Sequence, residues 1–253
     1  MPERGALVIY GRGADLGNFK FFADDLRTTE LASYGEHIQI VNVERRDAFF
    51  ELLLKPPLII QELHIYSHSI GGGLFLGYGD TAFDMARKSI RDERRGGRAN
   101  YISVLNAEQG SVLTDDLIRA PYAQYRDAIR SKFTPNAKIK IWGCNSGWNG
   151  WLYSDKDRSG NYVYDLDAPA ESYYWRALNE YNSPKPAVAQ AFANYFRVPT
   201  YGAGSGSSIQ VKYKGRWVSS PDFLKITRRR SVNEADVLRL APDRGDYNEY
   251  QPQ

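Results

Sequence analysis

The stretch IIQELHIYSHSIGGG, residues 59–73, decides the fold that we expect for this chain. Residues 59–67 contain three isoleucines and a tyrosine, which favour a buried strand over a helix. Pro56 and Pro57 end the helical segment before this strand, because proline cannot continue a helix. His68 and a run of glycines follow it. We therefore predict a buried strand that ends at His68 and leads into a glycine-rich hairpin.

A second stretch, IKIWGCNSG at residues 139–147, has the same layout. Its apolar part predicts another buried strand, and Cys144 follows that strand between small and polar residues. The two stretches therefore each place one chemically reactive side chain, His68 or Cys144, just past the end of a strand.

Strands and helices alternate on either side of these two stretches, which is typical of a mainly parallel sheet covered by helices on both faces. The expected strands are residues 6–10, 38–43, 59–67, 101–105, 139–142 and 198–203. The expected helices are residues 18–33, 48–54, 81–95, 121–133 and 187–196, and a hairpin is expected over residues 209–218. We predict one α/β domain over residues 1–240 and a polar, disordered tail over residues 241–253.

The composition favours an ordinary globular chain with little net charge. Of 253 residues, 42% are hydrophobic, and 33 basic against 30 acidic residues give a formal charge of +3. Nucleic-acid-binding proteins gather basic residues on one surface, so we expect no nucleic-acid partner. The composition says nothing about the oligomeric state.

The termini, hydropathy and cysteine content bear on where the protein is made. No segment approaches the ~20 apolar residues that span a bilayer, and no signal peptide precedes the first strand, so we expect no membrane span. The single cysteine excludes an intrachain disulfide. We expect a cytoplasmic protein as synthesised, and export by a signal-independent secretion system stays open.

His68 and Cys144 have the residue types of a nucleophile and its base. Parallel strands end at the same edge of a sheet, and neighbouring strands lie ~4.8 Å apart. If the two strands are neighbours, the imidazole and the thiol can meet above that edge. A cysteine nucleophile needs such a base, together with N–H donors for the oxyanion. His64, which lies inside the apolar run, is interpreted as a hydrogen-bonded core residue.

The motifs YSHS (residues 66–69) and WGCNS (residues 142–146), with the glycine-rich residues 71–79, resemble the two signatures of caspase-like cysteine peptidases. This group includes caspases, metacaspases, clostripain, gingipain, separase and the cysteine protease domains of bacterial toxins. In it, one strand ends at a catalytic histidine and a later strand ends at a catalytic cysteine. Residues 187–203 are similar to the helix and strand that follow the cysteine in bacterial members.

This resemblance implies a three-layer caspase-like (flavodoxin-like) fold and a cysteine endopeptidase that needs no cofactor. It implies that Cys144 attacks, that His68 transfers protons, and that the N–H groups of Ser69 and Cys144 hold the oxyanion. The implied partner is a peptide or protein substrate, and a bacterial effector role is implied by the other members. Ser69 departs from the pattern, because glycine is usual there.

Two alternatives use the same stretch differently. The segment SHSIGG, residues 67–72, also resembles the nucleophile elbow of serine esterases, with Ser69 as nucleophile. In those enzymes the catalytic histidine follows the serine, whereas no histidine follows Ser69 in this chain. The other alternative is a catalytically silent binding module with the same fold.

Other motifs receive simpler interpretations. Residues 11–17, GRGADLG, have the place but not the spacing of a dinucleotide loop, so we favour a glycine-rich turn. Asp155 and Asp157 begin a calcium-loop pattern as candidate metal ligands, but Leu166 stands where that loop needs glutamate, and we favour a turn. Arg12 and Trp148 are candidate substrate-binding residues.

Overall fold

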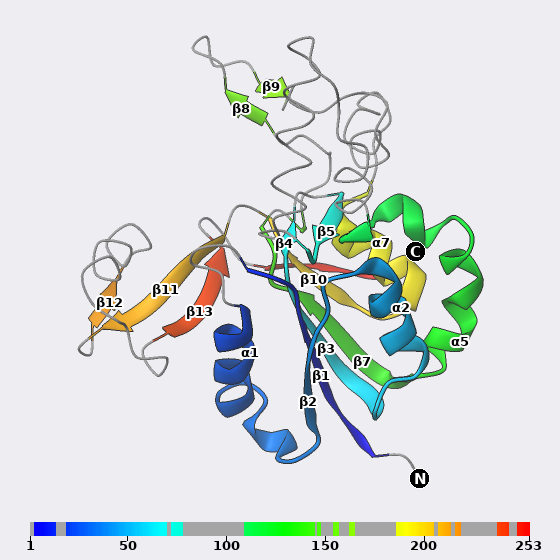
Figure 1. Ribbon diagram of the computed structural model, residues 1–253, viewed down its shortest axis with the longest axis horizontal. Helices are drawn as coiled ribbons and strands as arrows, with labels where there is room; N and C mark the ends of the chain where they lie inside the picture. Colours follow the sequence, from blue (N-terminus) through cyan, green and yellow to red (C-terminus); the bar gives the residue numbers. More distant parts are fainter. Residues whose placement is uncertain are drawn as a thin grey trace.

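The structure of the protein is a computed structural model (Figure 1). It describes residues 3–13, 19–69, 72–77, 109–144, 146–147, 186–204 and 247–253, and the backbone of five further strands at 154–156, 162–164, 207–213, 216–218 and 237–242. The helix expected at 81–95, the strand expected at 101–105 and the side chain of Trp148 lie outside the described residues.

Six strands form one sheet in the order β14-β10-β7-β3-β1-β2. These strands are β1 (Arg4–Tyr10), β2 (Ile38–Asn42), β3 (Ile59–Tyr66), β7 (Phe133–Ile141), β10 (Thr200–Ala203) and β14 (Tyr247–Tyr250). All neighbouring pairs are parallel except β10 and β14, which are antiparallel. The mainly parallel sheet expected from the alternating pattern is thus confirmed.

Helices cover both faces of this sheet, as Figure 1 shows. The helix α1 (Phe19–Thr28) packs on one face, and α2 (Arg46–Leu54), α5 (Arg126–Arg130) and α7 (Val188–Phe196) pack on the other. The chain of β1 alternates between these layers: Ala6 and Val8 face α1, while Leu7 and Ile9 face the other helices. A strand buried on both faces is what an α/β sheet covered by helices requires.

A small antiparallel sheet lies at the C-terminal edge of the large one. It consists of β4 (His68–Ser69), β5 (Gly73–Phe75) and β6 (Ser111–Leu113). A hairpin is therefore present after β3, but its first strand is β4, and only β5 lies within the glycine-rich residues 71–79 where the hairpin was expected. The backbone N–H of Arg12 donates to the carbonyl of Leu76 over 2.6 Å and ties this hairpin to the end of β1. Gly11 is required there, because a β-carbon would lie 2.6 Å from that carbonyl oxygen.

The remaining described strands form two further antiparallel sheets. The strands β11 (Ser207–Tyr213), β12 (Arg216–Val218) and β13 (Val237–Pro242) make a three-stranded antiparallel sheet, which confirms the hairpin expected at 209–218. The strands β8 (Ser154–Lys156) and β9 (Tyr162–Tyr164) pair with each other. Figure 1 shows β13 beside α1.

The helix expected at 121–133 is shorter than the prediction, which is corrected here. Its first part is the 3₁₀ helix η3 (Tyr122–Tyr125), its second part is α5, and β7 already begins at Phe133. The pairing of β7 with β3 skips from Phe133 to Lys138, and Pro135 lies in that irregular part. A proline has no N–H to donate, so it is tolerated at an irregularity of a strand but hides the strand from the sequence pattern.

The tail expected to be disordered from residue 241 is also corrected. The strand β13 extends to Pro242, and β14 pairs with β10 as the antiparallel edge of the large sheet. The hydroxyl of Tyr250 donates to the carbonyl of Gly147, and the ring of Tyr247 packs edge-on against Trp142. These two tyrosines anchor an otherwise polar strand. Within the described part of the chain, no helix has the length and apolar character needed to cross a bilayer.

Candidate active site

His68 and Cys144 follow the ends of β3 and β7, which are neighbours in the large sheet. Ile65 pairs with Ile141 in the β3–β7 register, and the N–H of Trp142 donates to the carbonyl of Ile65 over 2.9 Å. Three residues beyond this paired position, each chain reaches its reactive residue.

Gly143 holds the two strand ends together past the last paired residues. A β-carbon built on Gly143 would lie 2.6 Å from the carbonyl oxygen of Ser67 and 2.6 Å from the β-carbon of Ser69. The residue before Cys144 is therefore in contact with the two residues that flank His68. Any residue larger than glycine would force the strand ends apart, which explains why glycine precedes the cysteine.

Tyr66 lies two residues before His68, and Trp142 lies two residues before Cys144. The side chains of Tyr66 and Trp142 lie on the same face of the sheet. The rings of Tyr66 and Trp142 stack with centroids 5.2 Å apart and planes tilted by 11°, in the cluster that packs under α1. Side chains two apart on an extended strand point to the same face. The ring of His68 lies on this face as well, because it packs edge-on against Phe19, the first residue of α1, at a centroid distance of 5.1 Å.

His68 is largely enclosed, and its protonation follows from that. Burial lowers the pKa of His68 to about 4, because the imidazolium loses its hydration. The ring is therefore neutral at physiological pH and has the capacity to accept a proton. Cys144 is partly buried and, as the only cysteine of the chain, carries a thiol. A neutral imidazole has the capacity to take a thiol proton while a new bond to sulfur forms.

Ser146 fixes the turn that carries Cys144. It is fully buried, its hydroxyl donates to the carbonyl of Ile141 over 3.3 Å, and it accepts from the N–H of Ala203 over 2.9 Å. Its carbonyl accepts from the N–H of Ala189 in the first turn of α7 over 3.0 Å. The turn is thereby tied to β7, β10 and α7 at once. A serine two residues after a cysteine was the visible signal, but its role depends on contacts distant in sequence.

A polar network includes the side chain of Trp142, two residues before Cys144. The indole N–H of Trp142 donates to Nδ1 of His64 over 3.2 Å, so His64 carries its proton on Nε2 and donates it to Glu62 over 3.0 Å. Burial lowers the pKa of His64 and keeps it neutral. Burial alone would raise the pKa of Glu62, but hydrogen bonds from His64, Tyr34 and Lys138 lower it to about 2. His64 is thus the hydrogen-bonded core residue expected, and it fixes the indole of Trp142.

The surroundings of Ser69 differ from those of a nucleophile elbow. Ser69 is only 4% exposed, and it pairs with Leu74 in the β4–β5 hairpin instead of leading into a helix. Its hydroxyl is buried, and among the described residues it has no hydrogen-bond partner. Whether its N–H serves an oxyanion stays a prediction.

Arg12 is at the same edge of the sheet as the pair. Its backbone is bonded to Leu76 of the hairpin, and its guanidinium lies 3.6 Å from the carboxylate of Glu44, with 45% of the side chain exposed. Residues 14–18, which would complete the glycine-rich loop, lie outside the described residues.

Of the two calcium-loop candidates, only the backbone of Asp155 belongs to the described structure. Asp155 is in β8 opposite Val163, and Asp157 lies outside the described residues. In the described part of the chain, no group of three or more histidine, cysteine, aspartate or glutamate side chains is placed to hold a metal ion.

Comparison with known proteins gave no match: no family model fits the chain, and neither curated proteins nor solved structures resemble it closely enough to be matched.

Proposed function

We propose that the protein is a cysteine-dependent hydrolase, and specifically a caspase-like endopeptidase that uses Cys144 and His68 as a dyad. The observation that carries this proposal is the junction at Gly143. Gly143, the residue before Cys144, packs against both neighbours of His68, at the edge of the sheet where the parallel strands end. Ligands bind at this edge in open α/β sheets.

The chemistry follows from a neutral histidine and a thiol. The sulfur of Cys144 attacks the carbonyl carbon of a peptide bond, and the thiol proton passes to His68. The N–H groups of Ser69 and Cys144 hold the negative oxygen of the tetrahedral intermediate. His68 then gives its proton to the leaving amine, which departs and leaves a thioester on Cys144. Water, deprotonated by His68, hydrolyses that thioester and restores the thiol.

The environment of His68 supports the base role. Its pKa of about 4 keeps the imidazole unprotonated at neutral pH and thus able to accept a proton, although it is a weaker base than a free imidazole. Phe19 packs on its ring and restricts its orientation. On the substrate side, Arg12 lies at the same edge and is half exposed, so it lines the path of a bound peptide and favours an acidic side chain.

The test is covalent capture by peptide electrophiles. The wild-type protein is incubated with a mixture of peptide acyloxymethyl ketones that differ at the residue before the electrophile, and intact mass is measured. We expect a peptide-sized mass increase on Cys144 that is lost in Cys144→Ala and strongly slowed in His68→Ala. A Ser69→Gly variant is the control and should be labelled as well as the wild type.

The alternatives give different results in the same assay. A catalytically silent binding module would be labelled no faster than a free cysteine peptide, and equally in His68→Ala. A serine esterase would instead react with fluorophosphonate at Ser69. Either result contradicts the proposed dyad.

A further inference from the structure

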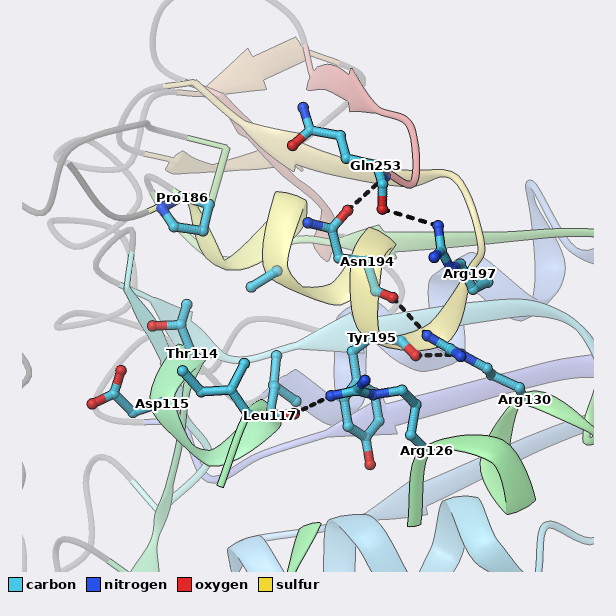
Figure 2. A pocket seen from close by; sticks show the side chains of 12 residues that line it. Thr114, Asp115, Leu117, Arg126, Arg130, Pro186, Asn194, Tyr195, Arg197 and Gln253 are labelled. Carbon is cyan, nitrogen blue, oxygen red and sulfur yellow. Dashed lines mark hydrogen bonds between the residues drawn. The ribbon is translucent and has the colours of Figure 1, made fainter. Parts of the chain in front are cut away.

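A pocket of about 340 Å³ lies on the sheet face opposite α1, between the 3₁₀ helix η2 (Thr114–Leu117), α5, α7 and the last residues of the chain (Figure 2). Neither His68 nor Cys144 lines it. The pocket is therefore distinct from the candidate active site, and a role for it is independent of the proposed function.

The lining of this pocket is strongly basic. It contains Arg126, Arg130 and Arg197, against a single acidic lining residue, Asp115. That aspartate is already ion-paired with Arg119 over 3.0 Å. Arg130 is also ion-paired with Asp127, outside the lining, over 3.2 Å. Figure 2 shows the three arginines along one side of α7. Burial, followed by repulsion from the other two arginines, lowers the pKa of Arg130, so the three charges act on one another.

One of the three arginines has a structural role. Arg130 donates from Nε to the carbonyl of Tyr195 over 2.8 Å and from Nη2 to the carbonyl of Asn194 over 3.0 Å. These carbonyls belong to the last turn of α7 and have no partner within the helix. Arg130 thus caps the C-terminal end of α7, and its side chain is occupied by that function.

Arg126 is held much less firmly. Its Nη2 donates to the carbonyl of Leu117 over a long 3.4 Å, and its guanidinium lies over the ring of Tyr195 at 5.7 Å from the centroid. Its Nε is buried and has no hydrogen-bond partner among the described residues. Arg126 as a whole is half-buried, and a guanidinium with a buried, unsatisfied Nε is a group that an anionic ligand satisfies.

Arg197 is held in a conformation that usually belongs to glycine. It follows α7 with a φ of 57°, in the left-handed region, where the backbone of a residue with a β-carbon is strained. Among the described residues, the guanidinium donates one hydrogen bond, from Nη1 to the main-chain oxygen of Gln253 over 2.9 Å. A strained backbone at a pocket wall, in place of the glycine that would fit there, indicates that the side chain itself is needed.

The rest of the pocket wall is apolar. Leu117, Ala191, Pro186 and the ring of Tyr195 line it, and so does Ile118, which is 69% exposed and is the one large hydrophobic side chain left exposed in the described part of the chain. Pockets that bind small molecules combine such apolar walls with a few placed polar groups. The size, about 340 Å³, fits a small organic molecule.

We propose that this pocket binds a small organic anion, with a carboxylate or phosphate group held by Arg126 and Arg197 and an apolar body against Ile118 and Tyr195. The guanidinium forks match either oxyanion. Arg130 stays bound to α7 and contributes its charge.

The experiment is isothermal titration calorimetry of the full chain with four probes: benzoate, phenyl phosphate, benzyl alcohol and inorganic phosphate. We expect benzoate or phenyl phosphate to bind at one site, and the tighter of the two identifies the anionic group. Benzyl alcohol lacks the charge and inorganic phosphate lacks the apolar body, so each should bind at least about tenfold more weakly.

Three variants locate the binding. Arg126→Gln and Arg197→Gly should each weaken the better probe by about tenfold or more, while Arg27→Gln, on α1 at the other face of the sheet, should leave it within about twofold. Thermal unfolding of the unliganded Arg197→Gly variant should occur at the wild-type temperature or above it, because glycine relieves the left-handed strain. This separates a lost ligand contact from a damaged fold.

Three outcomes would overturn the proposal. The first is that neither benzoate nor phenyl phosphate binds at millimolar concentration. The second is that benzyl alcohol binds as tightly as either anion, because the pocket would then be only apolar. The third is that Arg126→Gln and Arg197→Gly bind the better probe as tightly as the wild type does.

Discussion

Replacing Gly143 with alanine tests the junction on which the candidate site depends. The new β-carbon would lie 2.6 Å from the Ser67 carbonyl oxygen and 2.6 Å from the Ser69 β-carbon. Non-bonded carbon contacts settle near ~3.5–4.0 Å, so each contact is about 1 Å too short. Both neighbours are backbone or attached directly to it, so no side-chain rotation relieves the clash. We expect a loss of ~1–3 kcal/mol of unfolding free energy, as for an overpacked core.

The assay is urea denaturation followed by tryptophan fluorescence, with Gly204→Ala as the matched control. A β-carbon at Gly204 would lie 2.7 Å from Nδ2 of Asn248, the end of a flexible side chain that can move away. The control should therefore lose less than about 0.5 kcal/mol. In Gly143→Ala, alkylation of Cys144 should slow as well, because the strand ends separate. Equal denaturation midpoints in the two variants would refute the close packing of the strand ends.

Three further predictions concern single residues around the site. The folded-state pKa of His68, about 4, lies below its ordinary value of 6.5, so its neutral form stabilises the fold above pH 6.5 and this contribution is lost as the pH falls towards 4. His68→Gln should therefore reduce the change in unfolding free energy between pH 6.5 and pH 4 by up to about 3 kcal/mol. An unchanged pH dependence in chemical denaturation would contradict the burial of the ring. Ser146→Ala leaves the N–H of Ala203 without its acceptor, so it should lose ~1–3 kcal/mol in urea denaturation, and a neutral effect would argue against its role in the turn. A fluorophosphonate probe should not label Ser69, because its hydroxyl is buried; labelling that survives Cys144→Ala and disappears in Ser69→Ala would support the esterase alternative instead.

The sequence predicted the parallel sheet and the two strand ends because those features are local. Apolar runs such as residues 59–67 and 139–142 mark buried strands by themselves, and helices between them require parallel pairing. The neighbouring positions of β3 and β7 in the sheet could only be assumed, because strand order depends on contacts distant in sequence. The residue Gly143 was visible, but its contact with Ser67 and Ser69 was not.

The features that the sequence missed depend on tertiary contacts. The strand β14 has two polar residues between two tyrosines and is too short to show a period of two. It is stabilised by contacts with Gly147 and Trp142, which are far away in the chain. The start of β7 was hidden by Pro135. The arginine pocket combines α5 with the end of α7, so no local pattern reveals it.

The central claim, that His68 acts on Cys144, is tested most directly by the rate at which iodoacetamide alkylates the protein. Cys144 is the only cysteine, so intact mass reports its modification without ambiguity. We expect the wild type to be alkylated near neutral pH faster than both His68→Ala and a free cysteine peptide, whose thiol has an ordinary pKa of about 8.5. Equal alkylation rates in the wild type and His68→Ala across pH 5–9 would contradict the dyad and identify Cys144 as a structural residue.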